Sequence, residues 1–290
     1  MESDQIGVFL PSLGDGPLAT QMQQAVALGL QLVQPPLFDG MCPTEDTWKN
    51  LLSLANQHGL TISALSCYQD YTNPEGLEDR VTAMKKCLDY AVRLPNPVVI
   101  TETGGTPFSE GETRAREWKT LIEAMKHCTD HAGRVGAFVA IEPGGAGLVA
   151  SVESMHALIE EVDHPSLRLN LDPANVVMFG GDPHRAAREL GRHVIHTHAK
   201  DAVFHYTLTH DDFMRIAGKF STFEEIPALL GRDTPPCLEV PLGEGMVDWV
   251  LFMNSLAEAG YHGPYIIERE MGANRIEDIR KGIELLGSLR

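Results

Sequence analysis

The sequence has few basic side chains for its length. It contains 23 lysines and arginines against 40 aspartates and glutamates in 290 residues, which gives a formal net charge of −17. Proteins that bind nucleic acids normally present a basic surface, because they must displace counterions from the phosphates. We therefore expect no nucleic-acid partner.

Long apolar runs and a secretion signal are also missing. No apolar stretch approaches the roughly 18 residues that a membrane-spanning helix needs. The acidic start, Met1 to Gln5, lacks the basic region and apolar core of a signal peptide. The five cysteines are odd in number and none follows CxxC spacing, which favours reduced thiols. We expect no membrane partner and a cytoplasmic location.

Short apolar runs rich in β-branched residues alternate with stretches of helical periodicity along the chain. Alternating units with nearly continuous apolar strands are typical of a closed parallel barrel, whose strands are buried on both faces. The sequence therefore predicts an α/β protein with a (β/α)8 TIM barrel. The eight predicted strands are Ile6–Leu10, Leu30–Gln34, Thr61–Ser66, Pro97–Thr101, Phe138–Glu142, Arg168–Asp172, Val194–Ala199 and Tyr265–Glu268. The predicted helices include Leu18–Leu28, Trp48–His58, Leu77–Arg93, Arg114–Val135, Val152–Val162, Asp182–Leu190 and Asp248–Ala259.

An open, doubly wound sheet is the alternative fold. It would be favoured by a glycine-rich phosphate loop after the first strand, but residues 11–16 lack GxGxxG spacing. Residues 1–290 are therefore expected to form a single barrel domain. The one irregular stretch, residues 202–247, is predicted to be a long active-site loop that includes the short apolar run Cys237–Val240.

Four of the predicted strands end on residues that can bind a metal ion: Glu142, Asp172, His198 and Glu268. Reacting groups of such barrels lie at the carboxyl ends of the strands. A carboxylate there is costly to bury without a partner, and a metal ion is one efficient partner. A salt bridge or a helix cap would explain any one of these residues, but explains the whole set poorly. Three oxygen donors and one imidazole suit Mn²⁺ best among divalent cations, with Mg²⁺, Co²⁺ or Zn²⁺ as alternatives.

Five short segments are specific in their order and spacing: residues 140–143 (AIEP), 170–175 (NLDPAN), 195–201 (IHTHAKD), 241–245 (PLGEG) and 260–268 (GYHGPYIIE). Together they resemble the sugar phosphate isomerase/epimerase family, whose members have xylose isomerase-like TIM barrels. The resemblance implies one divalent cation at the positions of Glu142, Asp172, His198 and Glu268. It also implies that Glu142 and Glu268 are the catalytic acid and base.

The implied activity is the isomerisation or epimerisation of a sugar, keto-sugar or sugar derivative through proton abstraction beside a carbonyl and an enediolate intermediate. A lyase or dehydratase acting on a 3-keto-glycoside or keto-inositol begins with the same step and stays open as an alternative. Two further readings are a DNA repair enzyme like endonuclease IV, which shares the barrel, and a non-catalytic barrel that binds a metabolite. The strong negative charge disfavours the DNA repair enzyme.

Candidate substrate-binding residues surround the predicted metal site. Lys200 and His196 are each two residues from His198 and share its strand face, and Glu102 lies at the end of the fourth predicted strand, directly after Thr101. His196 is also compatible with a buried core histidine or with support of the metal ligands, and Lys200 with a salt bridge to Asp201. Asn175 stands where related ketose 3-epimerases carry a histidine that holds substrate hydroxyls.

The site departs from the ketose 3-epimerases at two positions. Asn175 replaces the histidine just described, and Phe204 occupies the place of an arginine six residues beyond the metal-binding histidine. Free ketose 3-epimerisation is therefore not the favoured reaction. Arg269 and Arg275 follow the last strand, a region where barrels often bind phosphate, so the sequence leaves a phosphorylated substrate open. The expected partner is a small carbohydrate, and a homo-oligomer is compatible with the sequence.

Overall fold

The computed structural model describes residues 5–36, 38, 42–106, 108–144, 147–216, 219 and 223–289. The first four residues of the acidic start, on which the absence of a signal peptide partly rests, lie outside this range. So do residues 217, 218 and 220–222 of the predicted active-site loop. Within the described residues, no helix is both long and apolar enough to cross a membrane.

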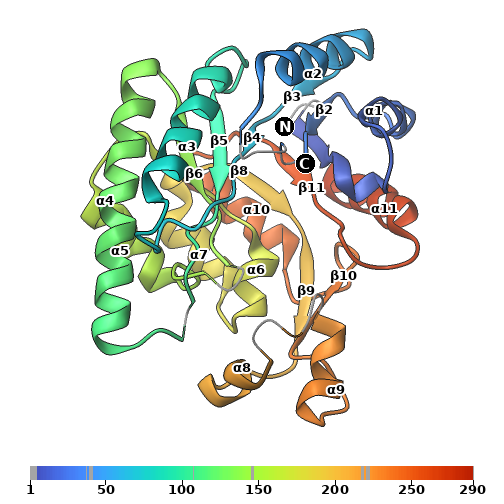
Figure 1. Cartoon of the computed structure of the whole chain (residues 1–290). Coiled ribbons are helices and arrows are strands. Elements are labelled where there is room, and N and C mark those ends of the chain that lie inside the picture. Colours follow the sequence, from blue (N-terminus) through green and yellow to red (C-terminus); the bar gives the residue numbers. More distant parts are fainter. Residues whose placement is uncertain are drawn as a thin grey trace.

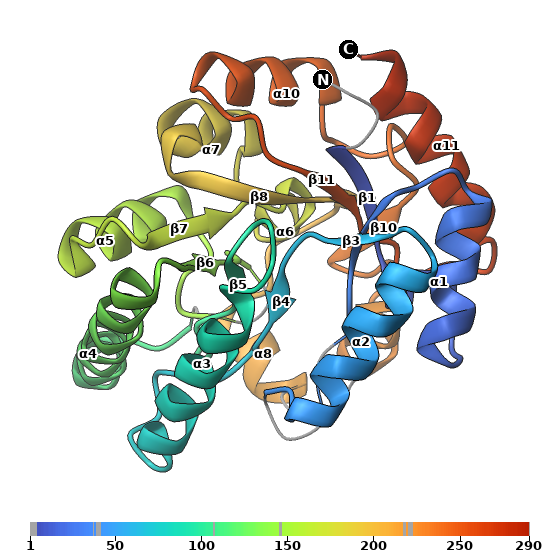
Figure 2. The ribbon, with the colours of Figure 1, turned by 90° about the horizontal axis from the view of Figure 1, so that it is seen from above.

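The predicted barrel is confirmed. Nine parallel strands form one sheet in the order β3-β2-β1-β11-β8-β7-β6-β5-β4, surrounded by helices (Figure 1, Figure 2). The two outer strands of this order, β3 and β4, belong to one predicted strand that is interrupted at Ser63 and Ala64. The strands are β1 (Ile6–Phe9), β2 (Leu32–Gln34), β3 (Thr61–Ile62), β4 (Leu65–Ser66), β5 (Val98–Thr101), β6 (Phe138–Ile141), β7 (Leu167–Asn170), β8 (Val194–Ala199) and β11 (Tyr265–Ile267).

The helices form a ring around these strands, as Figure 2 shows. Their apolar faces and the strands make one continuous core, in which Trp48, Phe252 and Leu88 are fully buried. The main helices are α1 (Leu18–Ala27), α2 (Glu45–Gln57), α3 (Leu77–Ala91), α4 (Gly111–Val135), α5 (Val152–Val162), α6 (Pro173–Met178), α7 (Pro183–Leu190), α10 (Trp249–Glu258) and α11 (Arg275–Ser288).

Helix starts follow local chemistry closely. Thr44 and Thr47 form a reciprocal capping box, so α2 begins three residues before the predicted Trp48. Ser151 and Ser154 form the same arrangement at α5, which has the predicted bounds. Capping side chains satisfy backbone N–H groups that the first helical turn leaves unpaired.

The described part of the stretch between Ala202 and Val247 contains more regular structure than the predicted long loop. Its ends pair as an antiparallel ribbon of β9 (Asp201–Phe204) and β10 (Cys237–Val240), with Glu239 opposite Ala202. The short helices α8 (His210–Ile216) and α9 (Ile226–Leu230) lie at its far end (Figure 1). The apolar run Cys237–Val240 is therefore a strand, because it finds a partner in the chain that leaves β8.

Asp201 closes the base of this insertion. Its carboxylate accepts hydrogen bonds from the backbone N–H groups of Gly243 (2.9 Å) and Val247 (3.2 Å) and from the Trp249 indole (3.1 Å). A Cβ atom at Gly245 would lie only 2.0 Å from Asp201 Oδ1, so the close wrapping of this turn requires glycine. Asp201 is thus used structurally and does not form the predicted alternative salt bridge with Lys200.

Candidate metal centre and active site

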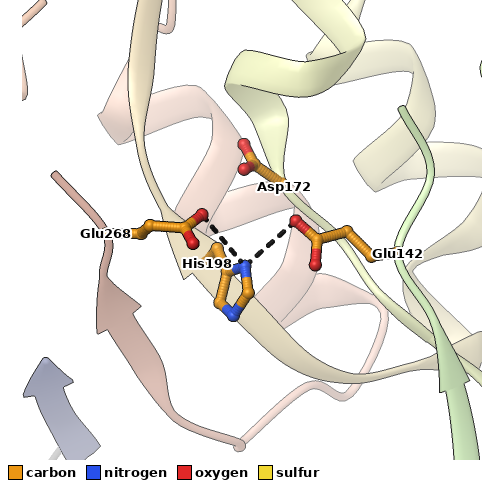
Figure 3. A group of neighbouring side chains, drawn as sticks. All are labelled: Glu142, Asp172, His198 and Glu268. Atoms are coloured by element: carbon orange, nitrogen blue, oxygen red, sulfur yellow. Dashed lines mark hydrogen bonds and ion pairs between the residues drawn. The ribbon is translucent and has the colours of Figure 1, made fainter. Parts of the chain in front are cut away.

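Four buried side chains converge at the carboxyl ends of four neighbouring strands (Figure 3). Glu142 directly follows β6, Asp172 lies two residues beyond β7, His198 lies in β8 and Glu268 directly follows β11. One potential ligand atom from each residue lies within 4.8 Å of the other three. The structure therefore brings together the four residues predicted to bind a metal ion.

The imidazole of His198 is held with one nitrogen toward the carboxylates. Its Nδ1 is 3.1 Å from Glu142 Oε1 and 3.3 Å from Glu268 Oε2. Its Nε2 donates to Gln34 Oε1 at 2.9 Å, and Gln34 in turn donates to Ser66 Oγ at 3.0 Å. Because a metal-binding histidine commonly donates its second ring N–H to a fixed acceptor, this arrangement suits ligation through Nδ1.

Asp172 provides the clearest test of whether a cation fits. Its Oδ1 caps α6 by accepting from the backbone N–H groups of Ala174 (2.8 Å) and Asn175 (3.1 Å). Its Oδ2 is buried and has no hydrogen-bond partner in the part of the chain that the structure describes. A buried carboxylate oxygen without a partner is costly. A cation bound by the four residues would satisfy it.

Glu142 is held by two neutral donors. The Tyr68 hydroxyl donates to Glu142 Oε2 at 2.6 Å, and Asn175 Nδ2 donates to Oε1 at 3.0 Å. Asn175 approaches this closely because Gly144, with φ of 119°, has no Cβ: one built there would lie 2.5 Å from the Asn175 Cβ. Burial and the neighbouring carboxylate raise the pKa of Tyr68 well above its ordinary value, so its phenol remains a donor.

Glu268 is held by a charged group. Lys200 Nζ lies 3.4 Å from Glu268 Oε2 and also pairs with Glu270 and Glu239. Burial alone would lower the pKa of Lys200, but these carboxylates raise it well above its ordinary value. Lys200 is therefore charged and faces the metal site. Glu270 is half exposed and reaches Lys200.

The other candidate residues occupy different sides of the centre. His196 lies on the side away from the carboxylates, with Nδ1 2.8 Å from Asn170 Oδ1 and Nε2 3.2 Å from Ser63 Oγ. It lines a cavity of about 670 Å³ at the opposite end of the barrel, and Asn170 links it to His198. Phe204, one of the departures from the epimerases, packs near Gly180.

Burial shapes the ionisation of the centre. Burial raises the pKa of Asp172 to about 8, opposed by Lys200 and reinforced by Glu142 and Glu268. Burial and the same two glutamates raise the pKa of Glu102 to about 7. Burial would lower the pKa of His198, but Glu142 and Glu268 outweigh it and raise the pKa well above its ordinary value. Without a cation, the centre therefore retains protons near neutral pH.

These shifts predict that the metal-free protein loses stability between pH 6.5 and pH 8. Asp172 and His198 have folded-state pKa values above their unfolded ones, so the folded state binds more protons in this window. Their stabilising contribution is lost as the pH rises through the folded pKa values, with a slope of up to about 1.4 kcal/mol per pH unit for each group. Denaturant titrations in EDTA across this window measure the slope. Saturating Mn²⁺ should flatten it, because the metal binds the deprotonated ligands, and equal slopes would contradict the prediction.

Sequence reasoning missed three residues that complete the centre. Tyr68, Gln34 and Glu239 contact predicted site residues. Gln34 ends a predicted strand but is a neutral amide, and Tyr68 and Glu239 end no predicted strand. Their side chains reach the centre only through the folded barrel. Among the described residues, the four predicted ligands form the one cluster of three or more metal-competent groups.

Comparison with known proteins places the chain in a family. The model of the xylose isomerase-like TIM barrel family matches residues 22–289. An inosose dehydratase from Geobacillus thermodenitrificans is 23% identical over 77% of this chain and 72% of its own length. The L-ribulose-5-phosphate 3-epimerase UlaE from Salmonella paratyphi A is 24% identical over 70% of this chain and 59% of its own length.

A solved structure agrees in fold. A xylose isomerase-like TIM barrel protein from Mycobacterium smegmatis, determined in complex with magnesium, superposes with a TM-score of 0.73 at 19% identity, covering 98% of this chain and 96% of that chain. The family includes sugar epimerases and dehydratases. From the matched model and the confirmed barrel, we conclude that this chain belongs to the xylose isomerase-like TIM barrel family.

Proposed function

We propose that the protein is a divalent-metal-dependent enzyme that removes a proton beside the carbonyl of a sugar, keto-sugar or sugar derivative and thereby isomerises or epimerises it. The observation that supports this most directly is the unpartnered Asp172 Oδ2, buried beside two glutamates and an imidazole nitrogen. The donor set suits Mn²⁺ first, and Mg²⁺, Co²⁺ or Zn²⁺ next. A bound cation would polarise the substrate carbonyl and acidify the adjacent C–H bond.

Glu142 and Glu268 carry the proton transfers in this proposal. They approach His198 Nδ1 from different sides, as Figure 3 shows, so a substrate between them would present a face to each. One carboxylate removes the proton, and the other returns a proton to the opposite face or to the neighbouring carbon. Tyr68 and Asn175 hold Glu142 in place, while Lys200 holds Glu268.

Three of the remaining candidates, Asn175, Glu102 and Lys200, orient the substrate in this proposal. Asn175 and Glu102 offer an amide and a carboxyl group to sugar hydroxyls, and Lys200 offers a positive charge near developing negative charge on oxygen. We assign His196 a role in supporting the metal ligand His198, because His196 contacts Asn170 and Asn170 contacts His198.

A dehydratase is the second candidate function. Glu102 favours it, because a carboxyl group with a pKa raised to about 7 is partly protonated near neutral pH and can donate to a departing hydroxyl. Its first step, proton removal beside a carbonyl, is the same. The similarity to an inosose dehydratase adds support.

Deuterium exchange tests the shared first step. Metal-loaded protein is incubated in D₂O with ketoses, keto-glycosides and inososes, and the products are followed by NMR. We expect deuterium to appear on a carbon beside the carbonyl, with an epimer, an isomer or an enone distinguishing the two functions. EDTA-treated protein is the control and should show no exchange. If the metal-loaded protein catalyses no exchange with any compound, proton abstraction on this class of substrate is refuted.

A further inference from the structure

The cations near the metal centre are already engaged by carboxylates. In the described chain, Lys200 is the one lysine or arginine that contacts the four clustered residues, and it is shared among Glu239, Glu268 and Glu270. Arg269 Nη1 lies 2.7 Å from Glu239 Oε1, and its Nε lies 3.0 Å from Asp278 Oδ2. Only 6% of Lys200 and 8% of Arg269 is exposed. Both cations are therefore buried among carboxylates and are largely shielded from solvent.

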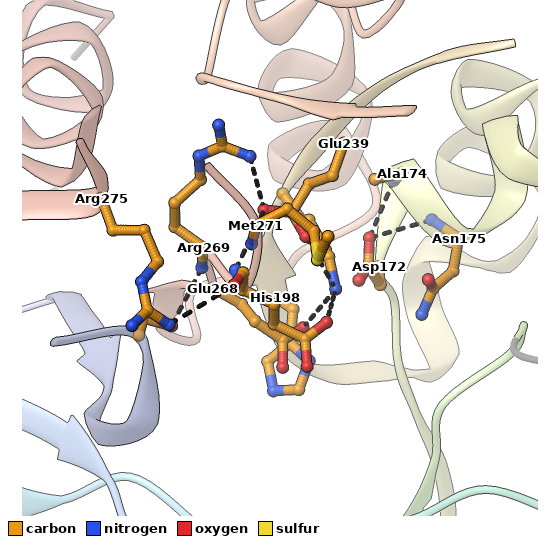
Figure 4. A network of polar contacts seen from close by, with 12 residues as sticks. Asp172, Ala174, Asn175, His198, Glu239, Glu268, Arg269, Met271 and Arg275 are labelled. Carbon is orange, nitrogen blue, oxygen red and sulfur yellow. Dashed lines mark hydrogen bonds and ion pairs between the residues drawn. The ribbon is translucent and has the colours of Figure 1, made fainter. Parts of the chain in front are cut away.

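Glu239 joins these two cations. It comes from β10 and is buried, and its Oε2 lies 3.5 Å from Lys200 Nζ while its Oε1 binds Arg269. The same Oε1 accepts from the backbone N–H groups of Glu270 (3.0 Å) and Met271 (3.2 Å), as Figure 4 shows in part. One side chain of the insertion thus pairs with both basic groups next to Glu268.

Arg275, the other basic residue after the last strand, lies elsewhere. It donates to the Glu270 backbone carbonyl at 3.4 Å and lines a separate cavity of about 420 Å³ with Ser12 and Asn274. None of the four clustered residues lines that cavity.

The balance of charge at the centre is therefore negative. Even with a divalent cation counted, the carboxylates outnumber the positive charges of that cation, Lys200 and Arg269. The carboxylates are those of Glu142, Asp172, Glu239, Glu268 and Glu270. A phosphate group entering here would meet unfavourable charge and would have to displace Glu239 from its partners.

We propose that Glu239 determines specificity by occupying the two cations that a substrate phosphate would need, so that the site accepts uncharged polyhydroxy carbonyl compounds and discriminates against their phosphates. This proposal rests on the proposed function for the identity of the site. An unfavourable charge of this kind separates substrates that share the same reacting carbonyl but differ in a phosphate group.

Matched pairs test it: L-ribulose against L-ribulose 5-phosphate, and D-fructose against D-fructose 6-phosphate. Binding to the Mg²⁺-loaded protein is measured by calorimetry, and deuterium exchange by NMR. We expect the wild-type protein to bind the free sugar about tenfold or more tightly than its phosphate. Glu239→Gln should lower this preference by about tenfold, because the charge that holds Lys200 and Arg269 is removed. Glutamine keeps an oxygen that can accept from Glu270 and Met271.

Glu189→Gln is the matched control, since it makes the same change in net charge within the Arg185 ion pair on α7. It should keep the wild-type preference. Glu270→Gln, at the half-exposed partner of Lys200, should shift the preference in the same direction as Glu239→Gln but less, and it serves if Glu239→Gln does not fold.

The outcomes separate the two proposals. Exchange that is equal for sugar and phosphate, or faster for the phosphate, would overturn the role of Glu239 and leave the proposed function standing. So would an unchanged preference in both folded variants. Preferential binding of free sugars without any exchange would support the charge argument and refute the proposed chemistry. Binding of neither class would overturn both.

Discussion

Glu142→Gln and Glu268→Gln are each expected to slow deuterium exchange beside the substrate carbonyl by about a hundredfold to ten-thousandfold, the range that positioned acid–base groups contribute. Glutamine has nearly the size and shape of glutamate but cannot take up or release a proton. Both side chains are buried and hydrogen-bonded, so the amide remains in place: Tyr68 and Asn175 contact position 142, and Lys200 contacts position 268.

The measurement is made at saturating metal, because each substitution also removes one negative ligand. Metal saturation is verified by calorimetry, and folding by the thermal transition. Glu189→Gln on α7 controls for the change in net charge and should exchange at the wild-type rate. If either variant at the metal centre retains more than about a tenth of wild-type exchange at full metal occupancy, the affected carboxylate is not an obligatory proton carrier.

Asp172→Asn is expected to weaken metal binding by about a hundredfold or more while leaving the fold intact. Even groups that only orient metal ligands contribute 10- to 100-fold to affinity, so a direct ligand should contribute at least as much. The two oxygens of Asp172 have separate roles: Oδ1 caps α6, and Oδ2 has no partner among the residues that the structure describes. Asparagine preserves the cap, because its amide oxygen can accept from Ala174 and Asn175, but its NH₂ group cannot bind a cation.

Calorimetric titration with Mn²⁺ or Mg²⁺ measures this effect directly, without any substrate. Asp182→Asn is a suitable control, since Asp182 caps α7 through the same pattern of backbone contacts and does not belong to the carboxylate cluster. It should bind metal as the wild-type protein does. Unchanged metal affinity in Asp172→Asn would show that Oδ2 is not a ligand, whatever else binds at the centre.

The barrel could be predicted from the sequence because the patterns that indicate its strands and helices are local. Strand β8 and helix α5 have the predicted bounds, since apolar runs and a capping box are read from neighbouring residues. The insertion between Ala202 and Val247 was not accessible in the same way. Its strand Cys237–Val240 pairs with a segment more than thirty residues away, and no local pattern indicates that partner.

The site residues likewise divide into those that local sequence patterns reveal and those that such patterns do not reveal. Glu142, Asp172, His198 and Glu268 each end an apolar run, so position in the strand reveals them. Gln34 ends β2 and Tyr68 lies two residues beyond β4, but neither is a charged residue, and their partners lie 164 and 74 residues away. Such contacts depend on how the barrel closes. The same holds for Lys200, whose pairing with Glu239 required the folded insertion and whose pairing with Glu268 and Glu270 required the closure of the barrel.

The hydrogen bonds that Asp201 accepts have a consequence for which part of the sequence can be altered without disturbing the barrel. The insertion leaves the barrel beside Asp201 and returns to it at Gly243 and Val247, so a single carboxylate holds both ends of the excursion together. The strands that carry the predicted ligands lie outside this insertion. We therefore expect that the segment beyond the β9–β10 ribbon can be exchanged or changed in length without opening the barrel. The predicted metal ligands and the segment that could alter substrate choice then lie in separate parts of the chain.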